Sequence, residues 1–310
     1  MKIVFLVLLF VVGAAMGSFA CCQARRMRRT EKGEKKLGKR SVCLSCKKTL
    51  RWYENLPIVS WVLQKGKCRK CGAKIGKTEI LAEFLTGVVF LAIGAYFAGF
   101  LRSKCGMMNF QCEEFVFVLK MSEWGVEIWI DIAMLVILLA VVTVLAIIFI
   151  YDALWQKMPT KVLWTAVGLA GVHFALRCVS ICMYTATDFA EIWNYYLGPE
   201  LLSAAFGVVI LAGVYFALYF FSKEQLVGSG DWILSLAVSL LIGDWFLALT
   251  ILFLSNFLAS VVMAPQVMGK NRKKRMNSKV PFGPFLIVAF IVVYLIQDAL
   301  KMMFYFNTLV

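Results

Sequence analysis

Residues 127–151, EIWIDIAMLVILLAVVTVLAIIFIY, form an apolar segment in which only Glu127 and Asp131, near its start, are charged. About 20 mostly apolar residues in a helix are enough to cross the hydrocarbon core of a bilayer. This segment is long enough to cross, and Asp152 follows its last residue directly. We therefore expect a transmembrane helix that ends with Asp152 at one membrane surface.

The composition extends this interpretation to the whole chain. Apolar residues make up 61% of the 310 residues, charged residues only 16%, and the mean hydropathy is +0.80. An ordinary soluble chain carries about 25% charged residues. The sequence predicts an all-α polytopic membrane protein with about eight transmembrane helices. The candidate spans are residues 2–22, 80–101, 127–151, 161–183, 200–221, 232–243, 245–268 and 282–304.

The distribution of charge sets the number of spans and their orientation. Candidates six and seven are separated only by Gly243 and Asp244, so they could also form one long bent helix. Between Cys22 and Ile80 the chain has 18 basic residues against four acidic ones, and residues 270–279 hold six more basic residues. Basic loops stay in the cytoplasm. Eight spans put both basic loops inside and both termini outside, whereas seven would expose one of these loops.

This asymmetry explains the net charge of +15 without a nucleic-acid partner, and it favours contact with anionic membrane lipid. The first span resembles a signal peptide, because Lys2 precedes an apolar run that ends in small residues. We prefer an uncleaved helix over residues 1–22, since cleavage would export the basic loop that follows. The remaining divisions are then a cytoplasmic loop at 23–79 and seven helices at 80–310.

The loop at 23–79 contains two CxxC pairs, Cys43 with Cys46 and Cys68 with Cys71. Four thiolates in such pairs are typical of a tetrahedral zinc site, and the neighbouring lysines and arginines favour deprotonation. Disulfides are disfavoured in a reducing cytoplasm, although free or disulfide-bonded thiols stay an alternative. Because the loop has few apolar residues, we expect zinc to provide much of its folding free energy.

The other six cysteines point to no metal site. We interpret the adjacent pair at the end of the first span as small packing residues. The remaining four fall in or near predicted external loops, where disulfides and simple packing are both open. These six are Cys21, Cys22, Cys105, Cys112, Cys178 and Cys182.

Two aspartates remote in sequence, Asp152 and Asp231, are predicted to lie at the cytoplasmic face. Two carboxyl groups close together can share one proton and so act as general acid and base, as in aspartic proteases. Gly228 and Gly230 before Asp231 would let the backbone turn sharply and let an extended peptide approach. The alternative is that both aspartates only cap helices. The single histidine, His173, has no evident Ser or Cys partner and is expected to pack.

In these features the chain resembles the bacterial prepilin peptidases, which are GxGD-type aspartic proteases also called type 4 leader peptidases. The similarity covers nearly the whole chain, and six motifs occur in the family's order. They are GSF at 17–19, the paired-cysteine loop, EFLTG at 83–87, Asp152 with Pro159, GSGD at 228–231, and VPFGPFLIVAF at 280–290.

The resemblance implies a cytoplasmic (inner) membrane enzyme that cuts the basic leader of type 4 prepilins or pseudopilins after a glycine, with Asp152 and Asp231 as the catalytic pair. It also implies methylation of the new amino terminus with S-adenosylmethionine, using the zinc-bearing loop at 23–79. A second class stays open. The chain could be a membrane assembly or transport protein with a zinc loop and without protease activity, whose aspartates are structural or ion-binding.

Overall fold

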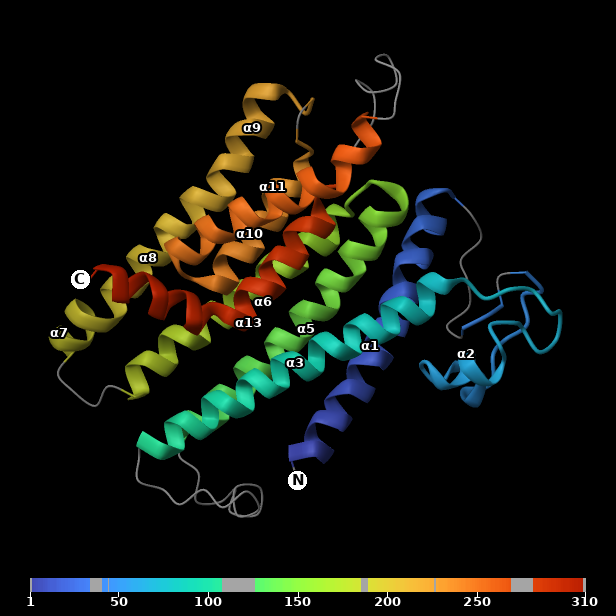
Figure 1. The fold of residues 1–310 in the computed structure, drawn as a ribbon, viewed down its shortest axis with the longest axis horizontal. Coiled ribbons are helices and arrows are strands. Elements are labelled where there is room, and N and C mark those ends of the chain that lie inside the picture. Colours follow the sequence, from blue (N-terminus) through green and yellow to red (C-terminus); the bar gives the residue numbers. More distant parts are fainter. Residues whose placement is uncertain are drawn as a thin grey trace. The chain divides into compact units, whose positions relative to one another are not determined.

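The computed structural model describes residues 2–33, 41–43, 45–107, 126–184, 189–225, 227–268 and 281–308. These residues are largely helical, and in place of strands they form only two isolated antiparallel bridges. The chain divides into two compact units, unit 1 (Met1–Glu123) and unit 2 (Trp124–Val310) (Figure 1). Cys112, Asp188, the basic segment at 270–279 and the side chain of Cys105 lie outside the described residues.

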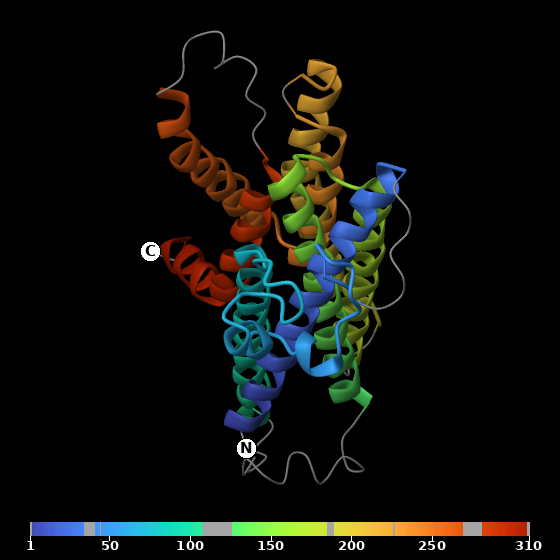
Figure 2. The same ribbon diagram turned by 90° about the vertical axis from the view of Figure 1, so that its right-hand side faces the viewer.

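Unit 1 is an antiparallel pair of long helices joined by the cysteine loop. Helices α1 (Lys2–Glu31) and α3 (Lys77–Met107) pack along each other (Figure 2). The loop between them contains the 3-10 turn η1 (Trp52–Asn55) and the short helix α2 (Val59–Leu63). We call residues 41–76 the cysteine module.

Glycines allow α1 and α3 to approach closely. A Cβ atom added to Gly17 would lie 2.6 Å from Ala82 O, and one added to Gly13 would lie 2.7 Å from Phe90 Cβ. Without a hydrophobic driving force inside a bilayer, helices associate through such small-residue contacts. Gly13 and Gly17 are four residues apart and so lie on one face of α1. This face fixes the register of the pair.

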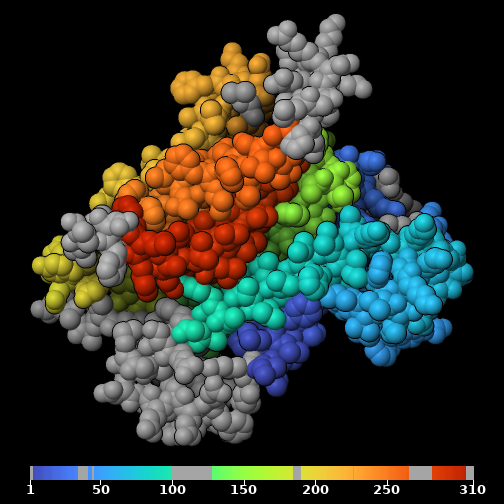
Figure 3. Space-filling model, viewed as in Figure 1, coloured from blue at the N-terminus to red at the C-terminus, as the bar shows by residue number. Residues whose placement is uncertain are grey.

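Unit 2 is a bundle of the remaining helices, in which α10 packs against α6. Helix α13 packs along α11 (Figure 3). It begins with α5 (Val126–Trp155) and α6 (Thr160–Tyr184). A continuous helical stretch follows, made of α7 (Phe189–Ile192), η3 (Trp193–Leu197), α8 (Gly198–Val208), η4 (Val209–Gly213) and α9 (Val214–Ser222). The last three helices are α10 (Ser229–Ile242), α11 (Trp245–Met268) and α13 (Gly283–Thr308).

The predicted fold class is confirmed. Among the described residues, seven helices are long and apolar enough to cross a membrane, and the sixth predicted span corresponds to the shorter apolar helix α10, of 14 residues. Helix α10 ends at Gly243, whose φ of +59° is left-handed, and α11 starts two residues later. A left-handed glycine of this kind commonly ends a helix. The sixth and seventh segments are therefore two helices and not one bent helix.

Two spans extend beyond their predicted limits by nine or more residues at one end. Helix α1 continues nine residues past residue 22, and Arg25 in this extension forms an ion pair with Glu79. The fifth span begins at residue 190 and not at 200. Pro199 lies in this longer helical stretch, just after the π-helical turn η3. Proline is tolerated there because π-type turns change the hydrogen-bond pattern that its missing N–H would otherwise interrupt.

The close contact at Gly17 gives a stability prediction. In Gly17→Ala the added methyl group meets the backbone of α3, so we expect a loss of roughly 1–3 kcal/mol, the usual cost of overpacking. The measurement is thermal unfolding of the purified protein in detergent. Gly99→Ala in α3 is the matched control, because no atom lies within 4 Å of its added Cβ. Equal stability of the two variants would contradict the proposed role of Gly17.

Candidate functional sites

Asp152 lies in the last turn of α5, and its carboxylate is buried, with a relative exposure of 4%. Its Oδ2 atom accepts a hydrogen bond of 3.1 Å from the backbone N–H of Gly283, the first residue of α13. The first N–H groups of a helix have no partner within that helix, and the helix dipole favours negative charge there. Asp152 thus supplies an acceptor to a helix that starts 131 residues later in the chain.

Asp231 is the third residue of α10, not the residue before it, so it is not the N-cap. Its Oδ2 atom accepts a hydrogen bond of 3.0 Å from the backbone N–H of Gly228, which does occupy the N-cap position. This is the carboxylate half of a capping box. The other oxygen, Oδ1, is buried and has no hydrogen-bond partner in the described part of the chain.

Met158 links the two aspartate-bearing segments. A Cβ added to Gly230 would lie 2.7 Å from Met158 Cβ, and one added to Gly283 would lie 2.5 Å from Met158 Cε and 3.0 Å from Asp152 Oδ2. Both glycines therefore leave room for the Met158 side chain. The negative charge of Asp231 also acts on the Asp152 carboxyl group. The helix starts of α10 and α13 and the end of α5 meet at this place, which we call the aspartate site.

The sequence identified four members of the aspartate site and missed three others. Gly228, Gly230 and the two aspartates were predicted, whereas Met158 was not singled out and Gly283 had no assigned role. Tyr215 was also missed. Its ring lies 5.1 Å from that of Phe282, its hydroxyl group accepts a hydrogen bond from Asn256, and its phenol interacts electrostatically with Asp231. Only Gly283 carried a local signal, because a glycine before a proline at a helix start offers a free N–H group.

The four predicted ligand cysteines come together in the cysteine module. Their Sγ atoms all lie within 4.8 Å of one another, and those of Cys43 and Cys71 are 3.9 Å apart. In a tetrahedral site with Zn–S bonds of about 2.3 Å, neighbouring sulfurs lie about 3.8 Å apart. None of the four forms a disulfide. The geometry of the four thiols therefore fits a zinc ion.

Both CxxC pairs have the same local structure, a repeat that the sequence analysis did not recognise. After Cys43, the Lys47 N–H bonds back to the Cys43 carbonyl oxygen, and after Cys68 the Gly72 N–H does the same to Cys68. Lys47 and Gly72 both have positive φ, +54° and +68°. The bridges at 42 with 49 and at 67 with 74 close the two turns equivalently.

Electrostatics in the cluster favour binding of a cation. Backbone N–H groups of Cys71 and Lys70 donate to Cys68 Sγ and lower the pKa of that thiol to about 6. Although the Ala73 N–H favours the Cys71 thiolate, partial desolvation and the neighbouring thiols raise the pKa of Cys71 to about 11. Four sulfurs this close cannot all ionise comfortably without a cation. A divalent metal removes that repulsion.

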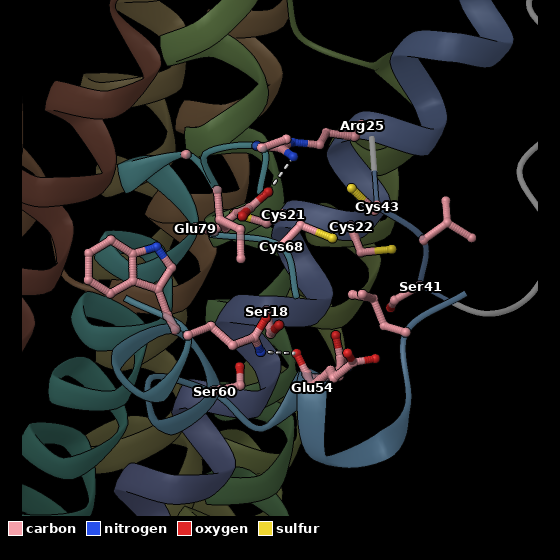
Figure 4. A pocket seen from close by; sticks show the side chains of 18 of the residues that line it. Ser18, Cys21, Cys22, Arg25, Ser41, Cys43, Glu54, Ser60, Cys68 and Glu79 are labelled. Atoms are coloured by element: carbon pink, nitrogen blue, oxygen red, sulfur yellow. Dashed lines mark hydrogen bonds and ion pairs between the residues drawn. The ribbon is translucent and has the colours of Figure 1, made fainter. Parts of the chain in front are cut away.

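A cavity lies beside the cysteine cluster, within unit 1. Its volume is about 320 Å³, and Cys22 from α1 lines it together with Cys43 and Cys68 from the module (Figure 4). The ion pair between Arg25 and Glu79 lies at its wall (Figure 4). Volumes of about 300–1,000 Å³ are usual for small-molecule sites. The cavity is thus large enough for a small ligand.

The fold and the two sites define a multi-pass membrane protein with a cysteine module that can hold a metal ion. Comparison with known proteins shows which families and proteins the chain is similar to. Residues 11–97 match the family described as the Bacterial Peptidase A24 N-terminal domain. No solved structure matches the chain.

Several similar proteins are named as prepilin-processing enzymes. The prepilin leader peptidase/N-methyltransferase of Myxococcus xanthus is 39% identical over 88 residues, which are 28% of this chain and 25% of that protein. The type 4 prepilin-like proteins leader peptide-processing enzyme of Escherichia coli O78:H11 is 48% identical over 52 residues, 17% of this chain and 19% of that protein. The Pseudomonas aeruginosa prepilin leader peptidase/N-methyltransferase is 28% identical over 254 residues, 80% and 69% of the two chains.

The chain therefore aligns with only a quarter or less of the first two relatives but with more than two thirds of the third. These matches confirm the resemblance to bacterial prepilin peptidases that the sequence motifs indicated.

The cysteine cluster leads to a prediction about metal content. Purified wild-type protein should contain about one zinc ion per chain, and the double variant Cys43→Ser with Cys71→Ser should contain none, because two ligands cannot hold the tetrahedral site. Elemental analysis of the detergent-purified protein measures this. Cys178→Ser together with Cys182→Ser, two free thiols of unit 2, is the control and should keep the metal. Full zinc occupancy in the first variant would refute the ligand assignment.

Proposed function

We propose that the chain is a membrane aspartic endopeptidase that removes the basic leader of type 4 prepilins or pseudopilins by cleavage after a glycine. The observation that carries the proposal is the meeting of Asp152 and Asp231 at one end of unit 2, where two helix N-termini hold them. The names of the similar proteins support the substrate class. An assembly or transport protein would not require two carboxylates in this arrangement.

The chemistry proposed for the aspartate site needs one shared proton. The ionised carboxylate takes a proton from water, and the resulting hydroxide attacks the scissile carbonyl carbon while the protonated carboxyl group donates to the carbonyl oxygen. The proton then passes to the leaving amide nitrogen as the C–N bond breaks. Asp231 Oδ1, which has no hydrogen-bond partner among the residues that the structure describes, is the oxygen available to the attacking water. The backbone N–H groups of Gly228 and Gly283 hold Asp231 Oδ2 and Asp152 Oδ2 in place through hydrogen bonds.

The geometry of the proposed substrate suits this position. A prepilin has an apolar helix that can lie in the bilayer and a polar leader that stays in water, so its cleavage point lies at the membrane surface. We place the aspartate site at the cytoplasmic face of the inner membrane, with both termini outside, because the basic segments at 23–79 and 270–279 should face the cytoplasm. Gly228 leaves space for an extended peptide beside Asp231, whereas the space at Gly230 is already occupied by the Met158 side chain.

Asparagine variants test the peptidase. Asp152→Asn and Asp231→Asn should each reduce leader removal from a co-expressed prepilin by at least about 100-fold, the usual contribution of a general acid or base. The measurement is the ratio of precursor to mature pilin by mass spectrometry of the pilin amino terminus. Asparagine keeps the size of the side chain and can still accept the N–H hydrogen bonds, so the variants should remain folded and membrane-inserted.

Asp298→Asn is the control, since Asp298 is an exposed aspartate of α13 in the same unit. This variant should process prepilin normally. Cleavage that survives either Asp152→Asn or Asp231→Asn would overturn the peptidase proposal and favour the assembly or transport alternative.

A second activity, methylation of the new amino terminus, is proposed for unit 1. The observation that favours it is the cavity beside the cysteine cluster, and the relatives' names include N-methyltransferase. S-adenosylmethionine would supply the methyl group, and the residues around Arg25 and Glu79 would hold it. The loop at 23–79 alone does not enclose this cavity, because Ser18 of α1 and Glu83 of α3 also line it. We therefore assign methyl transfer to the loop together with both helices, and proteolysis to the helices of unit 2.

Filling the cavity tests this second proposal. Cys22→Phe places a large ring in the cavity and should abolish binding of radiolabelled S-adenosylmethionine, measured by equilibrium dialysis with the full-length protein in detergent. Zinc content and leader cleavage should be retained. Asp152→Asn is the control and should bind the cofactor normally. Unchanged binding by Cys22→Phe would exclude this cavity as the cofactor site.

A further inference from the structure

The cysteine module carries an apolar surface that nothing in the described part of unit 1 covers. Leu56, Val59, Val62 and Leu63, on and next to α2, have relative exposures of 40%, 52%, 57% and 68%. We call these four side chains the α2 face. Trp52, in the neighbouring turn η1, is 78% exposed. Such a group of neighbouring large apolar side chains on a small module usually marks an interaction surface.

One hydrogen bond fixes the depth of this surface along the transmembrane helices. The backbone N–H of Ile58, which immediately precedes α2, donates to Glu83 Oε2 at 2.7 Å. Glu83 lies six residues after the start of α3, which corresponds to about 9 Å along the helix axis. Helix α2 is thus held beside a turn that already belongs to the apolar candidate span Lys77–Gly99.

The same turn of α3 also presents apolar side chains outwards. Leu81 is 56% exposed and Phe84 is 49% exposed, on either side of the buried Glu83. In a helix that crosses a bilayer, exposed side chains of this type face lipid. The α2 face lies at the same depth, so it meets the same environment.

The conformation at Ile58 indicates that this position is held against a local cost. Its φ of +60° is left-handed, which is unfavourable for a β-branched residue. The hydrogen bond to the buried carboxylate of Glu83 stabilises this conformation and turns the chain so that α2 begins there. The unfavourable backbone conformation of Ile58 is therefore offset by the contact that keeps α2 next to α3.

The charges of the module identify the kind of lipid surface. Residues 41–76 contain eight basic residues and one acidic residue, Glu54, which is already paired with Lys48. Lys65, Lys67, Arg69 and Lys70, which follow α2, are all exposed. An apolar face flanked by exposed basic side chains is typical of segments that lie in the interface of an anionic membrane.

We propose that the α2 face is inserted into the boundary between headgroups and acyl chains of the bilayer, and that the basic side chains after it contact anionic lipid headgroups. The cysteine module is then a membrane-surface element attached to α1 and α3, not a freely solvated loop. The proposal rests on unit 1 alone and holds whether or not the chain is a peptidase.

Depth-dependent fluorescence quenching tests the proposal. A coumarin amino acid replaces Leu63 in the full-length protein, which is reconstituted in vesicles of phosphatidylglycerol and phosphatidylcholine. The fluorescence should be largely lost when the lipids carry bromine on their acyl chains, and aqueous iodide should have little effect. Two matched positions calibrate the result. A probe at Phe84 should behave like the probe at Leu63, and a probe at Lys70 should be quenched by iodide and not by the brominated lipids.

The possible occupants of the α2 face give different results. If iodide quenches the Leu63 probe as strongly as the Lys70 probe, the surface faces water and the proposal is wrong. If neither quencher acts on the Leu63 probe, protein covers the surface and the proposal is also wrong. A probe that loses its exposure to iodide only after prepilin is added would assign the surface to the substrate instead. Prepilin cleavage by the labelled protein can be measured in parallel and fails or succeeds independently of these outcomes.

Discussion

The hydrogen bond from the Gly283 N–H group to Asp152 Oδ2 is the contact on which the aspartate site depends. A helix that starts near a bilayer has N–H groups without partners, and a buried carboxylate has a charge without a partner. The N–H group of Gly283 stabilises the carboxylate, and the carboxylate gives this N–H group a hydrogen-bond acceptor. The same solution recurs at α10, where Asp231 accepts from Gly228. Two helix N-termini therefore hold two carboxyl groups close together, an arrangement in which both groups would not ionise comfortably at once.

This arrangement reconciles two interpretations of the aspartates that the sequence left open. Capping uses one oxygen of each carboxylate, so the capping interpretation is correct as far as it goes. It does not account for Asp231 Oδ1, which is buried and has no hydrogen-bond partner within the described ranges, or for the burial of Asp152 beside another acid. A purely structural cap would be more stable with its second oxygen in water or hydrogen-bonded.

In unit 1 a basic loop with few buried apolar side chains must be stabilised by other contacts. The two CxxC turns share one backbone geometry and bring four sulfurs within reach of one metal ion. Buried Glu54 and Glu83 add polar anchors, through Lys48 and the Ile58 N–H group. The remaining apolar side chains of α2 are exposed, and the proposed insertion into lipid would remove them from water. The cavity beside Cys22 lies between these anchors.

The sequence by itself determined the helical membrane fold and the pattern of four paired cysteines, and it singled out the two aspartates that the structure brings together, because hydropathy, CxxC spacing and charge asymmetry are local signals. It also separated α10 from α11 correctly, from the charge of the two basic loops. The limits of α1 and the start of the fifth span were wrong by nine and ten residues, since an ion pair and a π-helical turn override the local pattern. Only the tertiary structure brought Met158, Tyr215 and Gly283 to the aspartates and Ile58 to Glu83. These contacts join residues far apart in the chain, and no local pattern encodes which distant N–H group a buried carboxylate will meet.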